Sequence, residues 1–335
     1  MMKHKNNTPE EIWSTLKKAK KILMSLHYAP DGDSLASCVA MKQVLEENLD
    51  CNVTLISKDN LDSILSELEY TKEVKFGKGI DEMDLSEFDI VLVLDIGAPN
   101  QFVGREKKFQ FPDNIPVINI DHHHTNTFYG TMNYVKNKSS ACAVLLELFK
   151  EWKIKINREL ATKILLGIYT DTGYFSHDNG EAIKDAAFLI EKRANYLDGI
   201  VNKIKYSVPL RIKKYIALLY QNFKIIQINN HNIGYSVATM HQIKSLGLNL
   251  AEARGGVNDL QELGGFDIIF TLTELEDKIK GSLRSRTCDI SIIARELGGG
   301  GHKKASAFVL PRMPLEQAEK QVLEAIRKVG VHKIN

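Results

Sequence analysis

Aspartate and histidine side chains recur in four short segments of this 335-residue sequence, at spacings that could bind metal ions. Imidazole and carboxylate groups without a nearby thiolate favour Mn²⁺, Mg²⁺ or Fe²⁺ over a structural zinc ion. The sequence therefore predicts a divalent-metal site. The segments carry His27 with Asp31 and Asp33, then Asp95, then Asp121-His122-His123, and finally Asp171 within Thr-Asp-Thr-Gly.

Each segment, taken alone, also has a purely structural explanation. His27 could be a core or turn histidine, and Asp31 and Asp33 could be turn residues, with Asp33 capping a helix. The run His122–His124 could be an exposed loop. Asp95 is harder to explain in this way, because a buried strand rarely ends in an unpaired acid. The four segments together favour the metal site.

Short apolar runs precede three of these segments and identify the elements that position them. Continuously apolar runs at 22–27, 53–56, 90–94 and 117–120 alternate with helical patterns such as 34–47. This alternation predicts an α/β fold, with a parallel sheet and helices on both faces. Ligands of such sheets bind at the carboxyl ends of the strands, where the acids and imidazoles lie.

The rest of the chain predicts a second, smaller domain. Helical patterns continue to residue 220, and strand-like segments then occupy 223–228, 233–239, 267–275 and 279–283, followed by helical stretches at 289–297 and 315–329. This order indicates an α+β unit. We expect a first domain at 1–195, a helical connector at 196–220 and a second domain at 221–335.

Composition excludes several classes of protein. With 44% hydrophobic and 26% charged residues, the chain can bury a core and is not disordered. No apolar run approaches the roughly 18 residues of a membrane helix, and no secretory signal opens the sequence. Four scattered cysteines predict a reducing, cytoplasmic location. A net charge of only +2 argues against coating long nucleic acids.

The motifs together resemble those of the DHH phosphoesterases. Their order is His-x-x-x-Asp-x-Asp, a strand-end aspartate, Asp121-His122-His123 with Asn126, and Thr-Asp-Thr-Gly. Near the end of the chain, Ser282-Leu283-Arg284-Ser285 and Gly299-Gly300-Gly301-His302 resemble the associated DHHA1 domain. Length and this pairing look most like the short oligoribonuclease/pAp-phosphatase (nanoRNase) branch. The resemblance implies an active site in the cleft between the two domains.

The resemblance also assigns roles to individual residues. One metal ion is expected on His27, Asp31 and Asp95, and the second on Asp33, Asp95, His122 and Asp171, with Asp95 bridging. Both ions would share a bridging hydroxide nucleophile. The expected cofactors are two divalent cations, with Mn²⁺ first and Mg²⁺, Co²⁺ or Fe²⁺ as alternatives. His123 is expected to be catalytic without binding metal, with Asp121 orienting an imidazole.

Substrate binding is expected mainly in the second domain. Arg284 suits a phosphate clamp, with Arg286 as a weaker candidate. Asn126 is expected to contact either the substrate or another residue of the site. The glycines Gly299, Gly300 and Gly301, with His302, could surround a terminal phosphate, although alone they could equally end a helix. Arg254 and the glycines after it form either a turn or another substrate contact.

These expectations lead to one function and its alternatives. The leading prediction is a phosphoric ester hydrolase that degrades very short, single-stranded RNA from one end and removes the 3′-phosphate of pAp. The alternative enzyme is a phosphodiesterase of cyclic dinucleotides or of pApA. A non-catalytic nucleotide-binding module is the alternative from another class. The resemblance also suggests a homodimer, and no membrane partner is expected.

Overall fold

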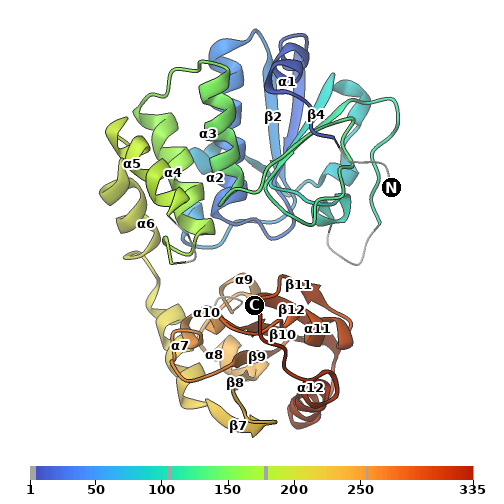
Figure 1. Cartoon of the computed structure of the whole chain (residues 1–335), viewed down its shortest axis with the longest axis vertical. Coiled ribbons are helices and arrows are strands. Elements are labelled where there is room, and N and C mark those ends of the chain that lie inside the picture. The colour runs from blue at the N-terminus through green and yellow to red at the C-terminus, as the bar shows by residue number, and fades with distance from the viewer. Residues whose placement is uncertain (1–4, 104–107, 177–179, 254–255, 335) are drawn as a thin grey trace. The chain divides into compact units, whose positions relative to one another are not determined.

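The computed structural model describes residues 5–103, 108–176, 180–253 and 256–334. The chain divides into two compact units, Met1–Ser207 and Val208–Asn335 (Figure 1). The predicted connector 196–220 falls across this division. Its second half lies in helix α7 (Leu210–Gln221), whose Tyr215 and Leu219 pack in a core of the second unit. The units are described separately below.

The first unit is built on a parallel six-stranded sheet, as the apolar runs predicted. The strand order is β3-β2-β1-β4-β5-β6, and every neighbouring pair is parallel. Strands β1, β2, β4 and β5 correspond to the four predicted runs, whereas β3 and β6 were not predicted. The strands are β1 (Lys21–Ser25), β2 (Asn52–Ser57), β3 (Lys75–Phe76), β4 (Ile90–Leu94), β5 (Val117–Asp121) and β6 (Met132–Val135).

Helices lie on both faces of this sheet, but they are of different kinds. One core joins one face of β1, β2, β4 and β5 to the α-helices, and α2 to α5 gather on that side (Figure 1). The opposite face packs against short 3₁₀ turns, through residues such as Ile80, Leu85 and Phe102. The α-helices are α1 (Pro9–Leu16), α2 (Gly32–Asn48), α3 (Ala141–Glu151), α4 (Arg158–Asp171), α5 (Glu181–Glu191) and α6 (Asn202–Ile204), with a π-helical turn at Tyr196–Val201. The 3₁₀ turns are Leu65–Glu67, Glu69–Glu73, Ile80–Glu82, Leu85–Glu87 and Pro99–Phe102.

The second unit contains a mixed six-stranded sheet in the order β11-β12-β10-β9-β8-β7. Strands β8 and β9 pair in parallel, and the other described pairs of this sheet are antiparallel. One face packs against α11 and α12, and the other packs against α7, α8 and α10. The strands are β7 (Lys224–Ile228), β8 (His231–Ala238), β9 (Ile268–Glu274), β10 (Lys278–Arg284), β11 (Gly300–Gly301) and β12 (Ala305–Pro311). The remaining helices are α8 (Met240–Ser245), α9 (Leu250–Ala253), α10 (Gly256–Leu260), α11 (Ser291–Glu296) and α12 (Leu315–Val329).

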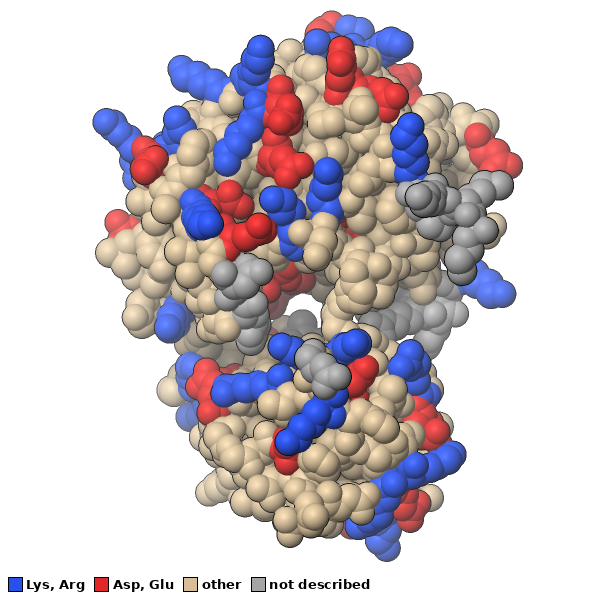
Figure 2. All heavy atoms as spheres, viewed as in Figure 1, with Lys and Arg blue, Asp and Glu red and all other residues tan. Residues whose placement is uncertain are grey.

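On the face of the first unit shown in Figure 2, acidic and basic side chains interleave. This agrees with the small net charge and differs from the continuous basic surface of proteins that coat long nucleic acids. Among the described helices, none combines the length and the apolar character that crossing a bilayer requires.

Candidate metal centre

The carboxyl ends of β1, β4 and β5 deliver the predicted metal ligands to one edge of the first sheet. His27 and Asp31 follow β1, and Asp33 lies in the first turn of α2. Asp95 follows β4 directly, and His122 follows β5. Asp171 is the last residue of α4, a helix that packs against α2. Strand ends and two helix termini therefore bring together residues that are far apart in sequence.

The donor atoms of these side chains form two neighbouring groups. The ligand atoms of His27, Asp31 and Asp95 lie within 4.8 Å of one another, and we name these residues the first ligand set. Asp33, His122 and Asp171 satisfy the same condition. His122 Nε2 lies 3.3 Å from Asp95 Oδ1 and 3.6 Å from Asp171 Oδ2. Asp33, Asp95, His122 and Asp171 form the second ligand set, so Asp95 adjoins both groups.

Backbone groups fix the orientation of two histidines that are predicted metal ligands. His27 Nδ1 lies 2.9 Å from the Tyr28 carbonyl oxygen, so Nε2 faces Asp31 and Asp95 at 3.6 and 3.7 Å. His122 Nδ1 lies 3.3 Å from the Lys138 carbonyl oxygen, and its Nε2 likewise faces carboxylates. Proteins usually orient a metal-binding histidine by a hydrogen bond to the ring nitrogen that does not bind the metal.

Helix termini fix two of the carboxylates. Asp31 is the N-cap of α2, and its Oδ1 accepts hydrogen bonds from the N–H groups of Asp33 and Ser34. Asp33, which is 1% exposed, accepts from the first N–H groups of α3, those of Ala141 at 2.6 Å and Cys142 at 3.0 Å. The N-terminus of α3 favours a negative charge at Asp33. Sequence reasoning missed this contribution.

Two glycines allow α4 to approach close enough to complete the second ligand set. A Cβ atom at Gly32 would lie 2.4 Å from Thr170 Oγ1 at the end of α4. A Cβ atom at Gly167, in the middle of α4, would lie 2.3 Å from Cys142 Sγ and 2.5 Å from Asp33 Oδ1. Both distances are far below van der Waals contact. Glycine at these positions therefore permits the packing that places Asp171 beside Asp33.

The backbone at Asp95 is in the left-handed region, with φ of 60°. Non-glycine residues in this region cost of order 1–3 kcal/mol, although aspartate tolerates it better than most. The N–H group of Asp95 donates to the Ile120 carbonyl oxygen at 3.2 Å, which ties the turn to β5. The strain therefore occurs at the residue that both ligand sets share.

Crowding of carboxylates changes the protonation of the ligand sets when no cation is bound. Burial and then the charge of Asp95 raise the pKa of Asp33 to about 7, and burial and then the charge of Asp33 raise the pKa of Asp171 to about 8. Burial lowers the pKa of His27, but its interactions with Asp31 and Asp95 outweigh that effect and raise the pKa to about 10. Retained protons thus partly offset the clustered negative charge.

The residues present fit two divalent cations. They offer four carboxylates and two imidazoles, with the imidazole Nε2 atoms aimed at carboxylate oxygens at 3.3–3.7 Å. These separations are close to those between ligands that share one metal ion with bonds of about 2.1 Å. Oxygen-rich donor sets of this kind suit Mn²⁺ and Mg²⁺. The predicted division of these ligands between two ions stays a prediction.

His123 is held differently from His27 and His122. Its Nδ1 lies 2.8 Å from Oδ1 of Asp121, which is fully buried. Burial lowers the pKa of His123, but the hydrogen bond and charge of Asp121 outweigh this effect and raise it above its usual value. Asp121 therefore orients an imidazole, as expected, and His123 is poised to carry a positive charge.

Asn126 supports Asp121 from the other side. Its side-chain amide donates to Asn119 Oδ1 at 2.8 Å and to Asp121 Oδ2 at 2.5 Å, and its Oδ1 accepts from the Phe128 N–H group. The Asn126 amide therefore holds Asp121 in position, which is one of the two roles expected for it. The substrate contact predicted for Asn126 stays a prediction.

The glycine run of the second unit ends helix α11 in a Schellman motif. The Gly298 N–H group donates to the Arg295 carbonyl oxygen, and the Gly299 N–H group donates to that of Ala294. Cβ atoms at Gly299 and Gly301 would lie 2.2 and 2.7 Å from carbonyl oxygens of β12. Glycine is thus required by local packing, and the N–H group of Gly299 is not available to a phosphate. Phosphate binding by Gly300, Gly301 and His302 stays a prediction.

The two arginines near β10 have partners within the second unit. Arg284 Nε donates to Asn258 Oδ1 at 2.8 Å, and its Nη1 donates to the Leu283 carbonyl oxygen at 2.9 Å. Arg286 Nη2 donates to the Gln261 carbonyl oxygen at 3.0 Å. These bonds hold Arg284 at the end of its strand, while its role as a phosphate clamp stays a prediction. Arg254 lies outside the described residues.

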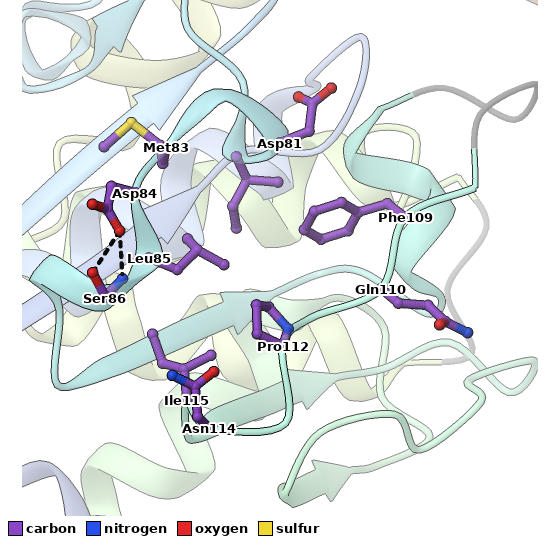
Figure 3. A pocket seen from close by; sticks show the side chains of 11 residues that line it. Asp81, Met83, Asp84, Leu85, Ser86, Phe109, Gln110, Pro112, Asn114 and Ile115 are labelled. Atoms are coloured by element: carbon purple, nitrogen blue, oxygen red, sulfur yellow. Dashed lines mark hydrogen bonds between the residues drawn. The ribbon is translucent and has the colours of Figure 1, made fainter.

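A separate pocket of the first unit, with a volume of about 310 Å³, contains none of the predicted site residues (Figure 3). Its lining mixes polar and apolar side chains, and the Asp84 carboxylate within it already accepts from the N–H and hydroxyl groups of Ser86. The pocket is distinct from the metal centre. Its lining consists of Ile80, Asp81, Met83, Asp84, Leu85, Ser86, Phe109, Gln110, Pro112, Asn114 and Ile115.

Two family models match most of this chain. The family model of the DHH family, N-terminal domain, matches residues 21–168, and that of the DHHA1 domain matches residues 232–329. A bifunctional oligoribonuclease and PAP phosphatase NrnA of Thermus thermophilus is 26% identical over 96% of this chain and 97% of its own length.

One further relative is named for the substrate it acts on, and one solved structure shares the fold of this chain. The cyclic-di-AMP phosphodiesterase PdeA of Listeria monocytogenes is 24% identical over 95% of this chain and 49% of its own length. An exopolyphosphatase-related protein of Bacteroides fragilis shares the fold, with a TM-score of 0.84 and 22% identity over 96% of each chain.

Proposed function

The chain is built from a DHH family N-terminal domain and a DHHA1 domain, and on this premise we propose that it is a metal-dependent phosphohydrolase of very short RNA oligonucleotides and of pAp. The convergence of two ligand sets on the shared Asp95 carries the proposal. Relatives that match nearly the full chain are named as oligoribonucleases and PAP phosphatases, which supports this choice of substrates.

The chemistry at the centre follows from the two ligand sets. When bound, two divalent cations would ionise a water molecule near neutral pH and neutralise charge on the reacting phosphate. Asp95 holds the two sets together, because its carboxylate adjoins His27 on one side and His122 on the other. We assign both cations as Mn²⁺, with Mg²⁺, Co²⁺ and Fe²⁺ as alternatives.

His123 is assigned to the phosphate or the leaving oxygen. Because Asp121 takes Nδ1 of the ring, any contact with the substrate would be made by Nε2. A protonated imidazole there would stabilise the charge that develops on a phosphate oxygen, or donate its proton to the departing hydroxyl oxygen. Asp121 and Asn126 keep the ring in the orientation and tautomer that this role requires.

We propose that the second unit selects the length of the substrate. Arg284 would clamp a terminal phosphate, and Gly300, Gly301 and His302 would add backbone and imidazole contacts. A fixed terminal contact favours substrates of a few nucleotides, and the interleaved surface charge offers little to a long strand. The homodimer and the cytoplasmic location stay predictions.

A second candidate is a phosphodiesterase of cyclic dinucleotides or of pApA. The relative named cyclic-di-AMP phosphodiesterase favours it, since that protein matches 95% of this chain. The same metal centre could hydrolyse either phosphodiester, so only the substrate contacts would differ.

A panel of substrates separates these candidates. Initial rates would be measured with Mn²⁺ on pAp, pApA, cyclic di-AMP, RNA of two to five nucleotides and a long single strand. The proposal expects the highest kcat/KM on the shortest RNAs, turnover of pAp, and little turnover of the long strand. Comparable kcat/KM on long and short RNA would contradict it, and a preference for cyclic di-AMP would favour the second candidate.

A substitution tests the role of the second unit independently of the metal centre. Arg284→Ala is expected to raise KM for a dinucleotide by about 10- to 100-fold with unchanged Mn²⁺ content, because a charge-assisted contact is lost. Arg312→Ala, at an exposed position of the same unit, is the matched control. An unchanged KM in Arg284→Ala would remove Arg284 from the substrate site.

A further inference from the structure

A second group of potential metal ligands lies in the second unit, outside the candidate metal centre. Ligand atoms of His231, Asp267 and Cys288 lie within 4.8 Å of one another. His231 begins β8, Asp267 immediately precedes β9, and Cys288 follows β10. We propose that these three residues bind a zinc ion that stabilises this edge of the second unit.

The spacing of the side chains resembles that of the first unit. His231 Nδ1 lies 3.4 Å from Asp267 Oδ2. In the candidate metal centre, the corresponding distances between imidazole nitrogens and carboxylate oxygens are 3.3–3.7 Å. For two ligands bonded tetrahedrally at about 2.0–2.1 Å to one Zn²⁺, geometry gives a separation of about 3.4 Å. A zinc ion could therefore bond both atoms with little movement.

The chemistry of the donors selects the metal. Unlike the two ligand sets of the first unit, this group includes a thiol, and a thiolate with an imidazole and a carboxylate suits Zn²⁺ better than Mn²⁺ or Mg²⁺. Binding would release the Cys288 thiol proton to solvent, and one thiolate and one carboxylate would then balance the charge of Zn²⁺. His231 and Asp267 are partly exposed, so water could supply a fourth ligand.

Hydrogen bonds hold the backbones of Asp267 and Cys288 and the residue next to His231 in place. The buried Ser285 hydroxyl donates to the Asp267 carbonyl oxygen at 2.6 Å and accepts from the Cys288 N–H group at 2.8 Å. Asp267 Oδ2 accepts from the Asn232 N–H group at 2.9 Å, next to His231. The donors therefore lie on a rigid frame formed by β8, β9 and the segment after β10.

A nucleophilic role for Cys288 does not fit the structure. The side chain is fully buried, and it packs in the hydrophobic core beside α11 and α12. A nucleophilic thiolate must meet its substrate, whereas a metal ion needs only the face of the sulfur that is turned toward the other ligands. The Thr287 hydroxyl, 3.5 Å from Cys288 Sγ, could donate to the thiolate of the bound form.

Cobalt substitution in the full-length protein tests this proposal. After chelation, Co²⁺ titrated into the wild type is expected to give the near-ultraviolet thiolate-to-cobalt absorption, and Zn²⁺ is expected to abolish it. Cys288→Ser should lose the absorption, whereas Cys51→Ser should keep it. An absorption that is absent from the wild type, or that persists in Cys288→Ser, would overturn the proposal.

Two further variants keep the test decisive if Cys288→Ser fails to fold. His231→Ala removes a ligand at the partly exposed end of β8 and is expected to weaken Zn²⁺ binding at this site by about 100-fold or more. Even a residue that only hydrogen-bonds to a metal ligand contributes about 10- to 100-fold to metal affinity. Unchanged affinity would refute the site. Asp95→Asn should retain the cobalt–thiolate absorption, so failure of the proposed function and failure of this site are distinguishable.

Discussion

The three histidines near Asp95 are held in two different ways, and the proposed function gives them different roles. His27 and His122 place Nδ1 near backbone carbonyl oxygens and turn Nε2 toward carboxylates. His123 instead pairs Nδ1 with the buried carboxylate of Asp121. Because a carboxylate or a backbone carbonyl oxygen can hold the far nitrogen of a metal-binding imidazole, the assignment of His27 and His122 to metal ions and of His123 to the substrate is part of the proposed function.

This distinction predicts different consequences of removing each ring. His123→Ala should retain wild-type Mn²⁺ content while kcat on a dinucleotide falls by about 10²- to 10⁴-fold, the usual contribution of a general acid. His122→Ala should lose both metal content and turnover. His124→Ala, at the exposed neighbouring position, is the control. Loss of Mn²⁺ from His123→Ala would show that this ring is a ligand.

The raised pKa values predict the pH dependence of the metal-free protein. Asp33 and Asp171 retain protons in the folded state up to about pH 7 and 8, whereas in the unfolded chain they lose them near pH 4. The folded state therefore binds more protons across this range, and its stability falls as the pH rises. The pKa of His27 is raised to about 10, so above about pH 6.5 the folded state keeps a proton that the unfolded chain loses. This also lowers the stability of the folded state as the pH rises.

We expect the thermal midpoint of the chelated protein to fall between about pH 5 and pH 8, and Mn²⁺ to diminish that fall by replacing the protons. Asp171→Asn should also make the fall smaller, because it removes one of the two groups. Thermal unfolding in buffers across this range, with chelator or with Mn²⁺, measures both effects. A midpoint that rises with pH in the chelated protein would contradict the assignment.

At the scale of elements, the metal centre depends on the close packing of α2, α3 and α4. Gly32 and Gly167 remove the Cβ atoms that would keep α4 away, and the first N–H groups of α3 bind the Asp33 carboxylate. Helix ends thus contribute as much to the position of Asp33 and Asp171 as the strand ends contribute to that of Asp95.

Gly167→Ala tests the packing directly. Alanine normally stabilises a helix interior by about 1 kcal/mol relative to glycine. Here the added Cβ would meet Cys142 Sγ and Asp33 Oδ1, so we expect lower stability and about 10-fold weaker Mn²⁺ binding. Gly264→Ala, where a Cβ would have open space, is the control. Unchanged Mn²⁺ affinity in Gly167→Ala would show that this approach does not position Asp33.

The sequence predicted the strands that carry the candidate metal centre, but it did not predict strand β12 or the contact between α3 and Asp33. Buried parallel strands are short apolar runs, so β1, β4 and β5 could be recognised together with the acids and imidazoles at their ends. Strand β12, Ala-Ser-Ala-Phe-Val-Leu-Pro, was missed because it mixes small and polar residues with apolar ones. The contact of α3 with Asp33 spans more than 100 residues, and no local pattern indicates it.

At the scale of the whole molecule, each unit has its own hydrophobic cores. The cores of the first unit lie on either side of its parallel sheet, and those of the second unit enclose the mixed sheet. The metal centre lies in the first unit, whereas the proposed substrate contacts and zinc site lie in the second. Metal binding at the centre should therefore stabilise one unit more than the other.

Metal removal should be visible as a selective change in unfolding. Mn²⁺ at about 1,000 times its dissociation constant stabilises the state that binds it by about 4 kcal/mol. In the His231→Ala variant, which lacks a ligand of the proposed zinc site, we expect chelation to accelerate hydrogen exchange in α2, α3 and α4 and to change it little in α12. Uniform acceleration in both units would contradict separate cores, and no acceleration in the first unit would argue against a metal ion there.

Crystallographic anomalous scattering from protein soaked with Mn²⁺ tests the central claim most directly. The account predicts two manganese peaks, one bound by the first ligand set and one by the second, with Asp95 bonded to both. A single ion remote from Asp95, or the absence of any peak at this edge of the sheet, would contradict it.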